Sequence, residues 1–171
     1  MNKKIITIII ILLIAVVGIT AYLNRGNVAE KEEAQKLAKL HFKENGNQIE
    51  TVDLNFIKTQ GEVTFNKGLD TSDSGPVEHS FTGVPLINIL EGVGIDLLEK
   101  EQLIINSVDG YTVALTATEV LKEDNVYIIY KSDGQYLKTK KEGGSGPYRI
   151  VIKDDKFGQR WSKFVTEVNV K

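Results

Sequence analysis

The stretch Gly143-Gly144-Ser145-Gly146-Pro147-Tyr148-Arg149-Ile150-Val151-Ile152 joins a glycine loop to a strand, and Arg149 stands at the junction. Glycine lets a loop backbone approach another group closely, and the apolar β-branched run after Pro147 is typical of a buried strand. The loop is not a P-loop, because no Gly-Lys-Ser/Thr follows it, and it is not a dinucleotide-binding fingerprint, because no helix follows it. The pattern predicts either a loop against a ligand or a purely structural turn.

Three more segments frame this stretch. Upstream, Phe81-Thr82-Gly83-Val84-Pro85-Leu86-Ile87-Asn88-Ile89-Leu90 enters a helix through a proline, a residue that suits the first helical turn. In the middle, Asp109-Gly110-Tyr111 is a tight turn between two strand-like runs. Downstream, Phe157-Gly158-Gln159-Arg160-Trp161-Ser162-Lys163-Phe164-Val165 closes the chain with a turn, two cations and aromatic side chains.

In this order the four segments resemble the oxidoreductase molybdopterin-binding domain of the sulfite oxidase family. That family commonly shows a Gly-Val-Pro-Leu helix entry, a central Asp-Gly-Tyr, a Gly-x-Pro-x-Arg loop and a closing Gly followed by Lys-aromatic. The resemblance covers residues 81–170, and it implies molybdopterin as the cofactor.

The resemblance also implies a set of cofactor-binding residues, in which the glycine loop lies against the pterin and the arginine lies near its phosphate. An arginine suits this place because its planar fork donates two parallel hydrogen bonds to phosphate oxygens. The predicted cofactor-binding residues are Gly144, Gly146, Tyr148, Arg149 and Lys163.

Other side chains of these segments have weaker roles in the comparison. Lys163 would add a point charge beside an anion, or else it is a solvated lysine on an edge strand. Tyr111 is the one catalytic candidate, as a donor to a metal-bound oxygen, although hairpin tyrosines more often serve packing. Arg160 and Trp161 match the family more loosely.

The metal ligand that the resemblance implies is absent. Catalytic members bind molybdenum through the pterin and one protein cysteine upstream of the Gly-Val-Pro-Leu segment, and this chain contains no cysteine. Ser72, Ser74 and Ser80 lie in that region and could offer an oxygen ligand, but nothing in the sequence selects one. No metal-binding residue is therefore predicted. His41 and His79 have no second ligand at zinc-site spacing.

Three hypotheses on function follow. The leading one is a non-catalytic binding or accessory module for a pterin-type or small anionic ligand. The second is an active molybdopterin-dependent oxidoreductase with a non-cysteine ligand. The third is a scaffold for protein contacts at the cell surface, in which Arg149 and Lys163 pair with carboxylates of the same chain.

The amino end predicts a membrane anchor. The run from Ile5 to Leu23 carries no charge, and at about 1.5 Å per residue a helix of this length spans roughly 28 Å, close to a bilayer core. Lys3 and Lys4 precede the run, which favours a single-pass protein of bacterial type with its carboxyl-terminal domain outside the cytoplasm. A cleaved signal peptide and a secreted domain are the alternative. No twin arginine, the export signal of folded proteins, precedes the run.

Composition adds two exclusions. The 171 residues carry a formal net charge of −2, which gives no indication of nucleic-acid binding, and without cysteine there are no disulfides. The predicted organisation is an anchor or signal segment over 1–24, a helical stalk over 25–47 and a molybdopterin-binding-like domain over 48–171.

For this domain we predict an α+β fold with a mixed, mainly antiparallel sheet and a few short helices, after one transmembrane helix. The expected helices are Val28–Glu44 and Val84–Gly92, with a further short one capped by Thr116 or Thr118. Asn66–Pro76 is expected to be a loop. The expected strands are Ile49–Lys58 paired with Glu62–Phe65, then Gln102–Val108, Tyr111–Leu115, Val126–Tyr130, Tyr136–Leu137, Ile150–Ile152 and Phe164–Val170.

Overall fold

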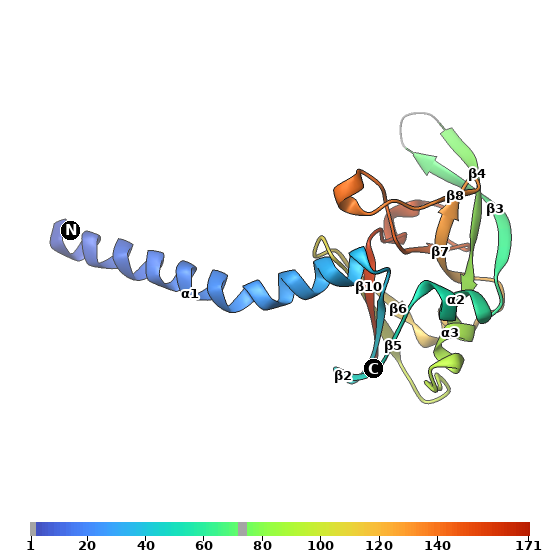
Figure 1. Cartoon of the computed structure of the whole chain (residues 1–171), viewed down its shortest axis with the longest axis horizontal. Coiled ribbons are helices and arrows are strands. Elements are labelled where there is room, and N and C mark those ends of the chain that lie inside the picture. The colour runs from blue at the N-terminus through green and yellow to red at the C-terminus, as the bar shows by residue number, and fades with distance from the viewer. Residues whose placement is uncertain (1–2, 72–74) are drawn as a thin grey trace. The chain divides into compact units, whose positions relative to one another are not determined.

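The computed structural model describes residues 3–71 and 75–171, and the side chains of residues 5–20, 22, 37–68 and 77–171. The chain separates into two compact units, Met1–Glu33 and Ala34–Lys171. Helix α1, Lys3–Lys36, accounts for the first of them (Figure 1). Its described apolar side chains are exposed, Ile8 by 63% and Ile14 by 67%. Among the side chains described, no helix combines the length and the hydropathy of a membrane span.

The stalk helix predicted up to Glu44 is wrong at its end. Helix α1 stops at Lys36, and Leu40–Glu44 is strand β1, in which Leu40 and Phe42 are fully buried. Strand β1 pairs in parallel with β10 (Val165–Val170), more than a hundred residues away. The local composition favours a helix, but burial of alternate side chains against a distant strand overrides that preference.

The first sheet has the order β2-β1-β10-β5-β6. Apart from the parallel β1–β10 pair, its neighbouring strands are antiparallel, so the predicted mixed, mainly antiparallel arrangement is confirmed. The predicted hairpin around Asp109-Gly110 is also confirmed. The other strands of this sheet are β2 (Asn47–Val52), β5 (Gln102–Ser107) and β6 (Thr112–Thr116).

The second sheet has the order β3-β4-β7-β8, with β9 also paired to β7. The predicted loop over Asn66–Pro76 is wrong within the described residues, because β3 continues to Thr71 and β4 begins at Gly75. Backbone pairing holds this polar hairpin in register, and no apolar alternation announces it. The strands are β3 (Val63–Thr71), β4 (Gly75–Pro85), β7 (Val126–Ser132), β8 (Gln135–Tyr136) and β9 (Arg149–Ile152).

Short helices connect the strands. Helix α2, Leu54–Thr59, replaces the second half of a predicted strand because Asp53 caps its start, accepting from the Phe56 amide at 2.9 Å. The predicted pairing of that strand with Glu62–Phe65 is therefore wrong. The helix after Pro85 and the Thr116 cap are confirmed. The remaining helices are α3 (Leu86–Gly92), α4 (Ala117–Leu121) and the 3₁₀ turns η1 (Lys140–Glu142) and η2 (Gly158–Arg160).

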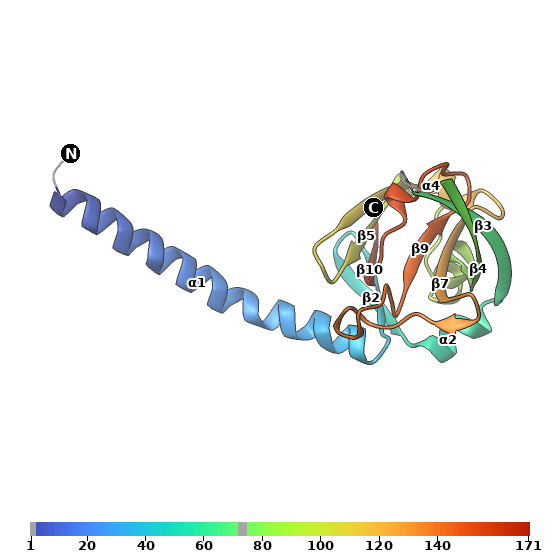
Figure 2. The ribbon, with the colours of Figure 1, turned by 90° about the horizontal axis from the view of Figure 1, so that it is seen from above.

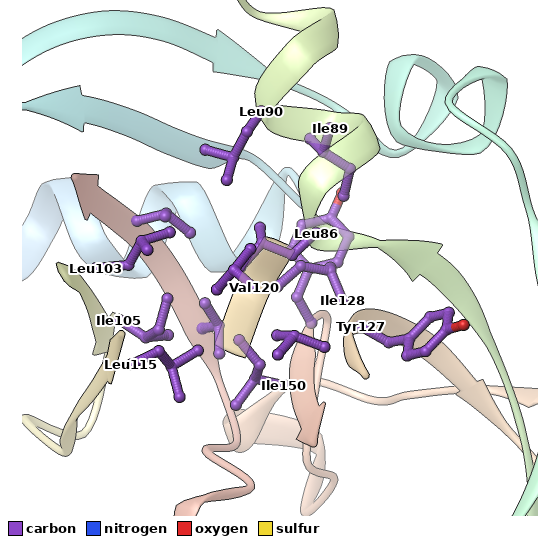
Figure 3. Close-up of a cluster of buried hydrophobic side chains, with 14 of the residues drawn as sticks. Leu86, Ile89, Leu90, Leu103, Ile105, Leu115, Val120, Tyr127, Ile128 and Ile150 are labelled. Atoms are coloured by element: carbon purple, nitrogen blue, oxygen red, sulfur yellow. The ribbon is translucent and has the colours of Figure 1, made fainter. Parts of the chain in front are cut away.

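The core of the second unit lies between the two sheets, whose strands run on opposite sides of it (Figure 2). Side chains from both sheets meet there with one face of α3 and with Val120 of α4 (Figure 3). All of the labelled side chains are at least 95% buried, so the domain is held by its apolar core. They are Leu86, Ile89, Leu90, Leu103, Ile105, Leu115, Val120, Tyr127, Ile128 and Ile150.

Candidate functional site

Three of the four sequence segments meet at the ring of Trp161. The guanidinium carbon of Arg149 lies 5.6 Å from the centroid of this ring, within the range of a cation–π contact. The ring of Phe81 stands edge-on to it, with centroids 6.0 Å apart and planes at 82°. The glycine-loop segment, the proline-helix segment and the closing segment therefore contribute one side chain each to a common site.

Arg149 is the polar centre of this site. It is the first residue of β9, where it pairs with Ile129 of β7, and it is only partly accessible. Its Nε is buried and has no hydrogen-bond partner among the described residues. Burial lowers the pKa of the guanidinium, although an arginine remains charged in proteins. A buried donor without a partner is costly, so an acceptor supplied from outside would satisfy it.

Trp161 is held in place by the strand that carries the arginine. The indole is 97% buried, and its Nε1–H donates to the carbonyl oxygen of Ile152 at 3.1 Å. The amide of Ile150 donates to the carbonyl oxygen of Ser162 at 2.9 Å. Two hydrogen bonds thus fix the closing segment against β9, and the aromatic wall beside Arg149 is rigid.

The glycines of the loop contact the chain itself. A Cβ on Gly144 would fall on the carbonyl group of Lys138, and one on Gly146 would lie 2.6 Å from the carbonyl oxygen of Leu137. The Gly146 amide donates to the Lys138 carbonyl oxygen at 2.8 Å. Both glycines are therefore required where the loop crosses residues 137–138. Their predicted contact with a ligand stays a prediction.

Tyr148 is fully buried, and its hydroxyl donates to the carbonyl oxygen of Ala38 at 2.6 Å. Burial raises the pKa of this phenol. Since adjacent residues of an extended chain point to opposite faces, Tyr148 and Arg149 diverge. The tyrosine ties the glycine loop to the start of the domain, and its predicted contact with a cofactor stays a prediction.

The other two predicted site residues lie outside the Arg149–Trp161 contact. Tyr111 is 50% exposed, and its hydroxyl donates to the carbonyl oxygen of Gln159 at 2.8 Å, which joins the fourth segment to the closing one. Lys163 is exposed, and within the described part of the chain it has no hydrogen bond or ion pair. Their roles towards a ligand stay predictions.

The model of the oxidoreductase molybdopterin binding domain family matches residues 31–171. The chain belongs to that family. No curated protein matches it. Among solved structures, the sulfane dehydrogenase SoxCD from Paracoccus pantotrophus is similar with a TM-score of 0.60 at 15% identity, over 77% of this chain and 37% of that one. This likeness shows the fold alone. The present chain spans little more than a third of that enzyme chain.

The cofactor of the family fits this molybdopterin-binding domain at one end. Arg149 offers a buried, unsatisfied donor to the phosphate. At the metal end, the cysteine ligand implied by the family is absent from the whole sequence. Within the described residues, no group of three His, Cys, Asp or Glu side chains could hold a metal ion. Of the three serines, Ser80 lies on β4, whereas Ser72 and Ser74 lie outside the described residues.

An imidazole beside the site of this molybdopterin-binding domain escaped sequence reasoning. The His79 ring lies 5.9 Å from that of Phe81, and its Nδ1 is 2.8 Å from an oxygen of Asp133. This contact, with the Ser80 amide, holds the pKa of the Asp133 carboxyl below its usual range. The spacing from Phe81 put His79 on the same strand face, but no local signal could pair it with a turn residue of another hairpin.

Arg160 is fully engaged within this molybdopterin-binding domain. Its guanidinium donates to Asp155 at 2.5 and 3.0 Å and to Glu119 at 2.8 Å. These contacts, Asp155 first, raise the pKa of Arg160. Arg160 therefore joins η2 to α4, in contrast to Arg149, for which no such carboxylate is present among the described residues.

We expect acid to weaken this junction. Burial alone would raise the pKa of Glu119, but hydrogen bonds from Thr116 and Arg160 outweigh it and hold the pKa below its usual value of 4.5. Since the folded-state pKa is the lower one, this stabilisation is complete above 4.5 and is lost as the pH falls through the folded-state pKa. Glu119→Gln should lower the free energy of unfolding at neutral pH by up to about 1 kcal/mol, because the pair is partly exposed.

Urea unfolding of wild type and Glu119→Gln at about pH 6.5 and about pH 3.5 measures the effect, since these values bracket the usual carboxyl pKa. The difference between the two proteins should shrink at the lower pH. An equal difference at both values would show that the carboxylate charge of Glu119 contributes nothing.

Proposed function

We propose that this molybdopterin-binding domain is a non-catalytic binding or accessory module that holds a pterin-type or other small anionic ligand at Arg149. The observation that carries the proposal is the buried guanidinium whose Nε lacks a partner in the described part of the chain. Evolution of a purely structural core would favour an apolar side chain at this place, because desolvating an unpaired charge opposes folding.

The chemistry of Arg149 selects an anion. A phosphate or carboxylate would accept parallel hydrogen bonds from the guanidinium fork, which also satisfies Nε. The Trp161 ring excludes water from one side, so the attraction acts through a lower effective dielectric than at an exposed site. A neutral ligand would leave the charge unpaired, and the site should therefore discriminate strongly against it.

The absence of cysteine supports a non-catalytic role. When bound, a molybdenum cofactor supplies oxo-transfer chemistry, and in catalytic relatives one cysteine completes the metal's ligands. This sequence has none, so the chain's own residues would bind and orient a ligand through its anionic group. An active oxidoreductase with another ligand is the alternative, and it makes the opposite prediction on metal content.

We further propose that the amino-terminal helix anchors the domain in a membrane, with the domain outside the cytoplasm. The support is the uncharged run from Ile5 to Leu23 after Lys3 and Lys4. The described apolar side chains of α1 are exposed, which is costly in water. In such an arrangement the ligand or partner would be met at the outer surface of the membrane.

The experiment is native mass spectrometry with elemental analysis on full-length protein. The chain is purified with nonionic detergent from carbonate-washed membranes of cells that make molybdenum cofactor. We expect it to stay in the washed membranes, to carry far less than stoichiometric molybdenum, and to bind a phosphorylated pterin or pyrophosphate in calorimetry. Stoichiometric molybdenum would sink the module hypothesis and favour the enzyme. Loss of the chain in the wash would refute the anchor alone.

A further inference from the structure

A groove of about 500 Å³ lies at the carboxyl end of α3, and neither Arg149 nor Trp161 lines it. Its volume is in the range of ligand-binding clefts. It is bounded by α3, by the loop that follows it and by the last residue of α4. The lining residues are Ile87, Glu91, Gly94, Ile95, Asp96, Leu97, Leu98 and Leu121.

The groove combines a buried apolar floor with an exposed apolar rim. Ile95 and Leu97 are 3% and 1% exposed, so they are packed against the core and give the groove a fixed floor. Leu98 is 78% exposed and Leu121 is 43% exposed. Two leucines that stand in water beside a hollow form an apolar surface that a bound partner would cover.

Carboxylates surround this apolar surface. Glu91 and Asp96 line the groove, and Glu99 and Glu123 follow closely after the two rim leucines in sequence. Within the described residues, the side chains of Glu91, Glu99 and Glu123 form no ion pair or hydrogen bond. Helix α3 also has no basic residue in its last turn, where a cation would be favourable.

The lysines next to these carboxylates are already engaged. Lys100 lies 2.6 Å from Glu44, and Lys122 lies 2.6 Å from Asp154. The groove rim therefore carries negative charge that its own sequence neighbours do not neutralise. Cations from a partner would meet unpaired carboxylates around an apolar centre.

We infer that this groove docks a peptide segment of a protein partner, in which a large aliphatic or aromatic side chain is flanked by lysine or arginine. The apolar side chain would cover Leu98 and Leu121, and the cations would face the carboxylates. An anionic lipid surface is disfavoured because the same carboxylates would repel it. The inference is independent of the anion site, since it rests on other residues.

The test uses a phage-displayed library of random dodecapeptides against the full chain in nonionic detergent, with counter-selection against the double variant Leu98→Ser/Leu121→Ser. We expect enriched peptides with an aliphatic or aromatic residue beside lysine or arginine. A synthetic copy should bind wild type at least ~10-fold more tightly than Leu98→Ser, because burying a leucine side chain contributes about 1.5–3 kcal/mol. Added salt should weaken binding.

Matched controls make the result specific. Ile49 on β2 is 43% exposed, like Leu121, and lies outside the groove, so Ile49→Ser should bind the peptide as wild type does. Glu91→Gln should weaken binding, whereas Glu78→Gln on β4 should not. The inference fails if counter-selection leaves no enriched peptide, if the enriched peptides lack cations, or if Leu98→Ser binds them with wild-type affinity.

Discussion

Arg149→Met is expected to abolish binding of an anionic ligand and, at the same time, to make the unliganded domain more stable. The guanidinium is desolvated, its Nε has no acceptor within the described residues, and its closest described contact is the Trp161 ring. Removing two charge-assisted hydrogen bonds, each contributing about 1.5–3 kcal/mol, should weaken phosphate binding by more than ~100-fold. An unbranched apolar chain of similar length would keep the packing without the buried charge.

The expected gain in the free energy of unfolding is about 0.5–2 kcal/mol, a common result when a functional residue is replaced by one that suits its surroundings. Urea unfolding of the ligand-free chain measures the gain, and calorimetry with pyrophosphate measures the loss of binding. Arg149→Lys should restore only part of the affinity, because an ammonium lacks the planar fork.

Arg160→Met is the matched control, since both arginines flank the same tryptophan segment. Arg160 has two carboxylate partners, so its removal leaves Glu119 and Asp155 without their cation, and stability should fall by about 1 kcal/mol. Opposite signs for the two variants would support a binding role for Arg149. If Arg149→Met destabilises the domain as Arg160→Met does, then Arg149 is structural and the proposed anion site is wrong.

The comparison of these two arginines also shows how far the sequence could be interpreted. The glycine-loop motif placed Arg149 at the start of a buried strand, and the family pattern ranked Arg160 and Trp161 lower. Local sequence could not show that Trp161 covers Arg149 or that Arg160 is neutralised, because the carboxylate of Glu119 comes from a helix about forty residues upstream. Contacts between distant segments decide which cation remains unpaired.

The same reason separates the elements that were predicted correctly from those that were not. Strands with a continuous apolar run, such as β7 and β9, and the helix capped by Thr116 carry their signal locally. Strand β1 sits in a sequence rich in helix formers, and its structure depends on pairing with β10. The β3–β4 hairpin is polar, so only its backbone partners reveal it.

Gly83→Ala is expected to be among the most damaging single substitutions in the domain. Gly83 lies in β4, where the pairing register shifts between Thr82 and Gly83 and brings the strand close to β7. An added Cβ would fall on the carbonyl oxygen of Ile128 and lie 2.7 Å from Cα of Ile129. Both are backbone atoms of a central strand, so they cannot turn away as a side chain would. This explains physically why the Gly-Val-Pro-Leu motif begins with glycine.

The expected loss is roughly 3 kcal/mol or more, at the upper end for overpacking, because relief requires separating β4 from β7 and disturbing the adjacent Phe81–Trp161 contact. Thermal and urea unfolding measure it, with Gly134→Ala as control. Gly134 has a φ of +78° but open space around it, so alanine there should cost only about 1 kcal/mol in backbone strain. A Gly83→Ala protein as stable as the Gly134→Ala control would mean that β4 and β7 can separate freely, and the rigid floor inferred beneath Trp161 and Arg149 would then be lost.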